Sequence, residues 1–173
     1  MQHLKNYFFF FFLVPMVFNA QEAKFSTDIS DYLDSNGTMS QYEYAYGELL
    51  KMLGSQFPKT ENNVEGWKYM EENKNMAVNE MKSLLIPIYK ENFTHGEIKE
   101  MTSFYKSEAG ELLINDRSKM TDLHKEELNT FYNSVLGKKI LEKQEILTQK
   151  ISKVSESWSR DLYETALSLL NIE

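Results

Sequence analysis

Few side chains of this chain have the types and spacing that chemistry needs, and those around His124 are the clearest. Glu126 and Glu127 lie two and three positions after His124, and a histidine with a carboxylate one helical turn away can share a metal ion. Such a site needs more ligands, but the other histidines are His3 and His95 and the chain has no cysteine. We therefore expect His124 on a solvated helix face, His95 at the surface, and no metal or other cofactor.

Carboxylates are the second chemical candidate, with Glu97, Glu108 and Asp116 as possible residues of a hydrolase. A catalytic pair needs a concave pocket in which two carboxylates converge and one has a perturbed pKa. Glu108 and Glu111 begin a predicted helix, where negative charge is favourable because of the helix dipole. The sequence has no nucleophile elbow, phosphate-binding glycine loop or dinucleotide fingerprint. These features favour binding over catalysis, with a hydrolase as the alternative.

Tyrosines provide a candidate interaction surface, formed by Tyr42, Tyr44 and Tyr46. Tyrosine combines apolar area with a polar hydroxyl, so it suits protein cores and interfaces alike. Tyr44 lies opposite the stripe of Tyr42 and Tyr46 on a helix, which makes it the best test of the two alternatives. The partner would be another envelope protein or an apolar ligand, bound at an exposed apolar patch or groove.

The first 20 residues have the features of a secretory signal peptide. Lys5 precedes an apolar run of 12 residues, Tyr7 to Phe18, and Asn19-Ala20 gives a cleavage point before Gln21. The run is too short to span a membrane, which takes about 20 apolar residues. We expect export to the periplasm or the cell exterior, with cleavage after Ala20 and no membrane span in the mature protein.

Composition indicates the fold class of the remaining chain and the partners that its charge disfavours. The full chain has 173 residues, a net charge of −7 and three prolines, and removal of Lys5 with the signal peptide makes the charge −8. A negative protein is a poor partner for nucleic acid or anionic lipid surfaces. Low proline content and helical spacing of apolar residues without strand-like alternation predict an all-α bundle of about five to six helices.

The predicted elements divide the chain into a signal peptide (1–20), a polar segment (21–39) and one helical domain (40–171). The polar segment has room for a short helix near 29–34. Apolar spacing predicts helices over 40–56 and 64–70, and another from about Asn75 that Pro87 should kink or end early.

Helix starts are the best defined local features of the domain. Thr94 and Glu97 form a capping box, with Phe93 and Ile98 as its hydrophobic staple. A further helix is predicted from Ser107 through residue 131. The last helix starts after Ser134 and, if unbroken to residue 170, is about 54 Å long. Its long apolar stripe needs a partner, which suggests a homo-oligomer.

Two segments repeat at an offset of 27 residues, 104–110 and 131–137. Each reads Phe-Tyr, then Ser, then Gly three positions after the Ser. The aromatic pair ends one helix, Ser caps the next, and Gly leaves space for a close backbone approach.

With these repeats the chain resembles the bacterial family of domains of unknown function numbered 2059, whose hallmark is such a Phe-Tyr, Ser or Thr, Gly unit, often followed by paired lysines. The resemblance covers roughly residues 40–160 and implies an all-helical exported protein of the bacterial envelope, with no established activity. It departs from the family in having two units. The residues that carry it are Trp67, Pro87, Tyr89, Thr94, Glu97, Phe104, Tyr105, Ser107, Gly110, Phe131, Tyr132, Ser134, Gly137, Lys138 and Trp158.

Overall fold

The computed structural model describes the backbone of residues 14–171 and the side chains of residues 20–171. This part of the chain is all-helical, as predicted, but it holds eight α-helices instead of five to six. Residues 1–13 of the expected signal peptide lie outside the described residues. The elements are α1 (Val14–Ser35), α2 (Thr38–Gln56), α3 (Val64–Glu72), α4 (Lys74–Asn92), α5 (His95–Tyr105), α6 (Glu108–Asn115), the 3-10 helix η1 (Arg117–Lys119), α7 (Asp122–Asn133) and α8 (Val135–Leu169).

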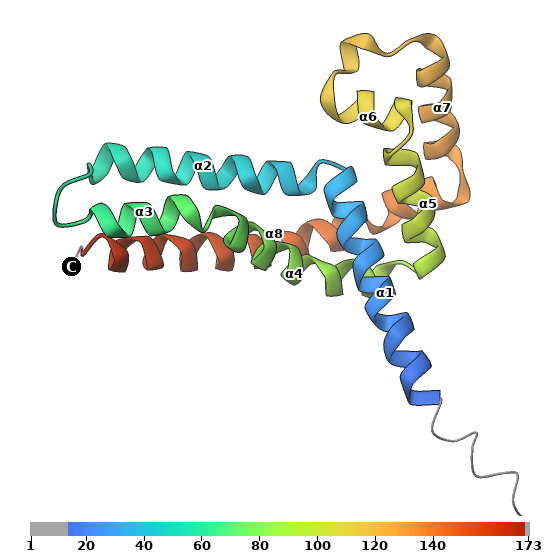
Figure 1. The fold of residues 1–173 in the computed structure, drawn as a ribbon. Coiled ribbons are helices and arrows are strands. Elements are labelled where there is room, and N and C mark those ends of the chain that lie inside the picture. The colour runs from blue at the N-terminus through green and yellow to red at the C-terminus, as the bar shows by residue number, and fades with distance from the viewer. Residues whose placement is uncertain (1–13, 172–173) are drawn as a thin grey trace, which may run out of the picture.

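The helices form two arms (Figure 1). In the long arm, α2, α3 and α4 run beside the C-terminal part of α8. In the short arm, α5, α6 and α7 stack on one another at the other end of α4. Helix α1 lies where the arms meet and packs on α5, α4 and α2.

The predicted helix starts at Thr94, Ser107 and Ser134 are confirmed. The hydroxyl of Thr94 accepts a hydrogen bond from the Glu97 amide, while the Glu97 carboxylate accepts one from the Thr94 amide at 2.7 Å. The hydroxyls of Ser107 and Ser134 accept from the amides three residues on, at 3.3 and 3.0 Å. These contacts satisfy amides that a helix cannot bond internally.

The single helix expected from Ser107 through residue 131 is wrong, because the chain breaks into α6, η1 and α7. Asp116 accepts a hydrogen bond from the Ser118 amide and thereby caps η1. Thr121 then starts α7 in a capping box whose reciprocal partner is His124. The sequence does not predict the start of α7, because the capping-box pattern expects Glu or Gln at the position of His124.

The structure also differs from the expectation of a polar segment with a short helix between residues 21 and 39. Most of this segment belongs to α1, and Ile29 and Leu33 are fully buried. Phe25, Ile29, Tyr32 and Leu33 recur at spacings of four, three and one, which places them on one helix face. The contribution of α1 to the core follows from this narrow stripe.

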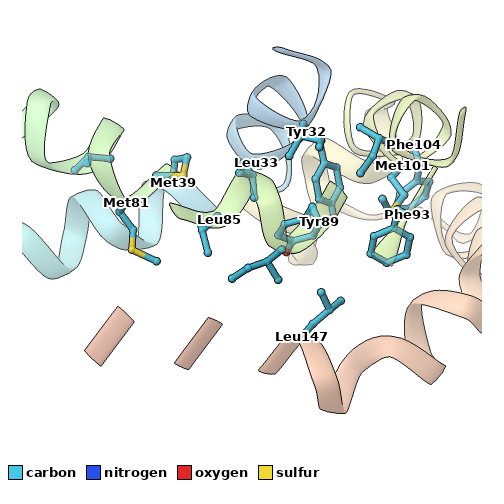
Figure 2. Packing of buried hydrophobic residues seen from close by; sticks show 14 of the residues in the cluster. Tyr32, Leu33, Met39, Met81, Leu85, Tyr89, Phe93, Met101, Phe104 and Leu147 are labelled. Atoms are coloured by element: carbon cyan, nitrogen blue, oxygen red, sulfur yellow. The ribbon is translucent and has the colours of Figure 1, made fainter. Parts of the chain in front are cut away.

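The main core lies between α1, α4, α5 and α8 (Figure 2). Tyr32 and Leu33 point from α1 toward Leu85 and Tyr89 of α4, and Leu147 of α8 lies across from them. Pro87 does not end α4, which continues to Asn92.

Helix α8 is 35 residues long and unbroken, about 52 Å at 1.5 Å per residue. From its start to its end, α8 contacts α7, then α4 and then α3. Its buried residues, which pack within the chain, include Leu136, Leu147, Trp158 and Ala166. The apolar stripe thus has partners without a second subunit, and self-association stays a prediction. Among the described residues no helix is both long and apolar enough to cross a membrane.

Candidate functional site

The two repeated units meet each other inside the short arm. The rings of Phe104 and Phe131 stack with centroids 3.9 Å apart and planes 3° from parallel. The hydroxyls of Tyr105 and Tyr132 lie 3.3 Å apart. Burial, and then the hydrogen bond with Tyr132, raise the pKa of Tyr105 above its ordinary value. These four residues form an aromatic contact between equivalent positions, which is a packing role.

The glycines of the two units are needed because the backbone of the preceding helix comes very close to them. A Cβ on Gly110 would lie 2.1 Å from the carbonyl oxygen of Phe104, and one on Gly137 would lie 2.3 Å from that of Phe131. The start of each capped helix therefore presses on the end of the preceding helix, as the sequence suggested.

The other residues of the family resemblance are distributed over both arms. Trp158 is buried and its Nε1 donates to the carbonyl of Ala77 at 3.0 Å. Trp67 is buried at the far end of the long arm, and Tyr89 lies in the main core, where burial raises its pKa to about 12. Pro87 and Lys138 are exposed.

The three carboxylates considered for a hydrolase do not converge. Glu97 sits in its capping box and receives two hydrogen bonds from Lys139 of α8, at 2.8 and 2.7 Å. Burial alone would raise the pKa of Glu97, but the hydrogen bonds from Lys139 and Thr94 outweigh it and hold the pKa below its usual value. Asp116 caps η1, and the Ser118 and Lys119 side chains lower its pKa.

The histidines are less exposed than expected. His124, whose side chain is 15% exposed, lies 3.5 Å from the carboxylate of Glu108, the third hydrolase candidate. His95 contacts Asp28 of α1 and stacks on Phe25. His95 and His124 therefore each join two helices. No group of three or more metal-ligating side chains occurs within the described part of the chain.

The candidate tyrosine surface separates into packed and exposed residues. The Tyr42 hydroxyl lies 2.6 Å from that of Ser155, and its ring meets Trp158 edge-on. Tyr46 is buried and donates to the carbonyl of Met70 at 2.8 Å. Tyr44 is 69% exposed. Of the three, only Tyr44 presents its ring to solvent.

Tyr44 lines a groove of about 700 Å³ between the α1–α2 corner and the end of α6. We call it the Tyr44 groove. A second hollow of about 490 Å³ shares part of its lining and extends it toward α1. The residues of the Tyr44 groove are Asn36, Gly37, Ser40, Gln41, Tyr44, Leu113, Ile114, Asn115, Asp116 and Arg117.

Gly37 sets the width of this groove at the α1–α2 corner. Its φ of 79° is left-handed, a conformation that other residues rarely adopt. A Cβ there would also lie 2.8 Å from the Cγ2 of Ile114. The corner and the end of α6 can therefore approach closely, while Ile114 stays 39% exposed.

The groove offers apolar, amide and cationic groups together. Tyr44 and Ile114 supply apolar area, and the side-chain amides of Gln41 and Asn115 make no hydrogen bond within residues 20–171. Arg117 donates through Nε to the Leu113 carbonyl at 3.0 Å but has no ion pair in that range. Asp116 is engaged with Ser118 and Lys119. The unpaired charge in the groove is therefore the positive charge of Arg117.

Sequence reasoning identified Tyr44 but missed the residues opposite it. Ile114 follows Leu112 and Leu113 as one more apolar residue, and nothing local shows that it faces a groove. Tyr44 and Arg117 are 73 positions apart in the chain, and only the fold brings them to one groove.

Comparison with known proteins identifies a family for this chain. The family model described as "Uncharacterized protein conserved in bacteria (DUF2059)" matches residues 79–123 and 117–165. Each matched segment contains one of the two repeated units. No curated protein and no solved structure matches the chain.

Proposed function

The chain belongs to the bacterial DUF2059 family, and we propose that it is an exported envelope protein that binds a polypeptide segment of another envelope protein in the Tyr44 groove. The observation that carries this proposal is the exposed ring of Tyr44 in a groove that Ile114 and Arg117 also line. Tyr and Arg dominate the energetics of many protein interfaces because they combine large contact area with hydrogen bonding.

The side chains that line the groove indicate which residues the partner segment carries. An apolar side chain fits against Tyr44 and Ile114, and a carboxylate is complementary to Arg117, which has no ion pair within residues 20–171. The side-chain amides of Gln41 and Asn115 suit the peptide groups of an extended segment. The proposed partner therefore carries an acidic residue close to an apolar one.

Export rests on the N-terminal pattern of Lys5, the apolar run and Ala20. Among the described side chains, the first that packs on the core is that of Phe25. Cleavage after Ala20 leaves Phe25, Ile29, Tyr32 and Leu33 of α1 in the mature protein.

A hydrolase is less well supported. It needs two of Glu97, Glu108 and Asp116 in one pocket, and each of these carboxylates contacts a different basic side chain instead.

Photo-crosslinking tests the binding proposal. A photoreactive benzoylphenylalanine replaces Tyr44 in the expressing bacterium, and a matched protein carries it at Tyr69, a tyrosine of α3 that is 45% exposed. We expect a discrete adduct at position 44 and none at position 69. The adduct should weaken in the Arg117→Ala and Ile114→Asn backgrounds, and its partner peptide, identified by mass spectrometry, should contain an acidic residue beside an apolar one. Equal adducts at both positions, or an adduct insensitive to Arg117 and Ile114, would refute the proposal.

A further inference from the structure

Another hollow, separate from the Tyr44 groove and its extension, lies along the seam of α4 and α8 in the long arm. Its volume is about 320 Å³, which is near the lower end of the range for small-molecule sites, roughly 300–1,000 Å³. Leu84 of α4 and Val154, Trp158 and Leu162 of α8 supply its apolar lining. We call it the α4–α8 hollow.

The apolar lining of the hollow is held in place before any ligand arrives. Trp158 is 5% exposed, and its Nε1 is bonded to the Ala77 carbonyl across the seam. Tyr42 also packs on the Trp158 ring in an edge-on contact, at 5.5 Å between centroids. Leu84, by contrast, is 39% exposed although it lies on a packed helix. The hollow thus combines a fixed aromatic surface with an uncovered aliphatic side chain.

Two carboxylates line the same hollow from opposite helices, Glu80 from α4 and Asp161 from α8. Glu80 makes no ion pair within residues 20–171. Asp161 has Arg160 at 3.8 Å, but both side chains are more than half exposed, so this pair is weak. The hydroxyls of Ser157 and Thr165 add further acceptors.

We propose that the α4–α8 hollow binds a small organic ammonium ion with an apolar body. The ammonium group lies between Glu80 and Asp161, where it donates hydrogen bonds to carboxylates that have no other strong partner. The apolar body lies on Leu84, Leu162 and the Trp158 ring, and an aromatic face also attracts a cation. An anionic or neutral ligand lacks this complementarity in a protein whose net charge is already −7.

Hexylammonium is the probe, and two compounds separate its parts. Hexanol has the same chain without the charge, and ammonium chloride has the charge without the chain. Calorimetry on the purified protein should detect saturable binding of hexylammonium, with hexanol and ammonium chloride at least about tenfold weaker.

Tryptophan fluorescence locates the binding. Trp67 and Trp158 are the two tryptophans, and Trp67→Phe leaves Trp158 as the reporter. Trp67 packs in the cluster at the far end of the long arm, and its Nε1 has no hydrogen-bond partner within the described residues, so phenylalanine loses no bond there. Hexylammonium should change the Trp158 emission.

Charge-removing variants decide between this hollow and non-specific binding. Glu80→Gln and Asp161→Asn should each weaken hexylammonium binding about tenfold, and both carboxylates are exposed, so folding should be preserved by circular dichroism. Glu164→Gln removes an exposed carboxylate from the same helix outside the lining and should change nothing. Absence of saturable binding, equal binding of hexanol, or equal effects of all three substitutions would overturn the proposal.

Discussion

At the scale of single residues, the repeated Phe-Tyr, Ser, Gly unit is explained by one steric requirement. In both copies the Ser hydroxyl accepts from the Gly amide. Because that Gly has no Cβ, the carbonyl of the preceding Phe can come so close that a side chain at the Gly position would clash with it. Capping and close approach therefore depend on the same two residues, which explains why Ser and Gly recur together.

Gly110→Ala and Gly137→Ala should each destabilise the protein by about 3 kcal/mol or more, because the clash is with backbone that cannot turn aside. Urea unfolding followed by circular dichroism measures this. Gly47→Ala is the matched control, since nothing lies within 4 Å of a Cβ there in the interior of α2. It should stabilise by roughly 0.5–1 kcal/mol. Similar effects at all three positions would contradict the steric explanation.

At the scale of elements, Glu97 links the start of α5 to α8. Its carboxylate completes the capping box and accepts hydrogen bonds from Lys139. Lys139 also lies 5.6 Å from the ring centroid of Phe93, the staple residue before α5. The capped helix start and the long helix are therefore stabilised by the same ionised group.

Acid should weaken this link. Because the pKa of Glu97 is lowered in the folded protein, its contribution to stability is complete above the unfolded value of about 4.3. The contribution fades as the pH falls through the folded value. Glu97→Gln should cost about 1 kcal/mol at pH 7, and less below pH 4, by urea unfolding at both pH values. Glu100→Gln removes an exposed carboxylate from the same helix and should be nearly neutral, and a pH-independent loss in Glu97→Gln would contradict the prediction.

At the scale of the whole molecule, α1 joins the two arms. Ile29, Tyr32 and Leu33 are buried in the main core. Glu22 pairs with Lys90 of α4 at 2.5 Å, and Phe25 stacks on His95 of α5. The part of α1 after the expected cleavage point thus contacts both neighbours, and the two arms depend on this part of the helix.

A chain that begins at Gln21 should be as stable as the full chain, because it keeps Phe25, Ile29, Tyr32 and Leu33, the side chains that pack α1 on the core. A chain that begins at Ser30 loses Phe25 and Ile29 and should be less stable by roughly 3 kcal/mol or more. Thermal unfolding of both chains measures the difference. Mass spectrometry of the protein recovered from an expressing bacterium should find Gln21 as its first residue. Retention of residues 1–20, or unfolding of the chain from Gln21, would contradict this prediction.

The sequence by itself determined the features that depend on interactions within a few residues. The capping box of Thr94 and Glu97, the Ser caps and the unbroken α8 all follow from contacts three or four positions apart. Helical spacing of apolar residues was enough for the all-α class. Local signals failed at α7, where a histidine replaces the usual carboxylate or amide of the capping box, and at α1, whose buried stripe is narrow.

Only the tertiary structure decided which surface residues face one another. Tyr42, Tyr44 and Tyr46 share one helix, and packing against α8 and α3 buries or covers two of them while Tyr44 remains exposed. Ile114 and Arg117 line the same groove as Tyr44 because Gly37 lets the α1–α2 corner approach α6. Glu80 and Asp161 share a hollow because α4 packs along α8. In the groove and in the hollow the paired residues are 70 or more positions apart. Such pairings are set by how whole helices bury their apolar faces, which no local pattern records.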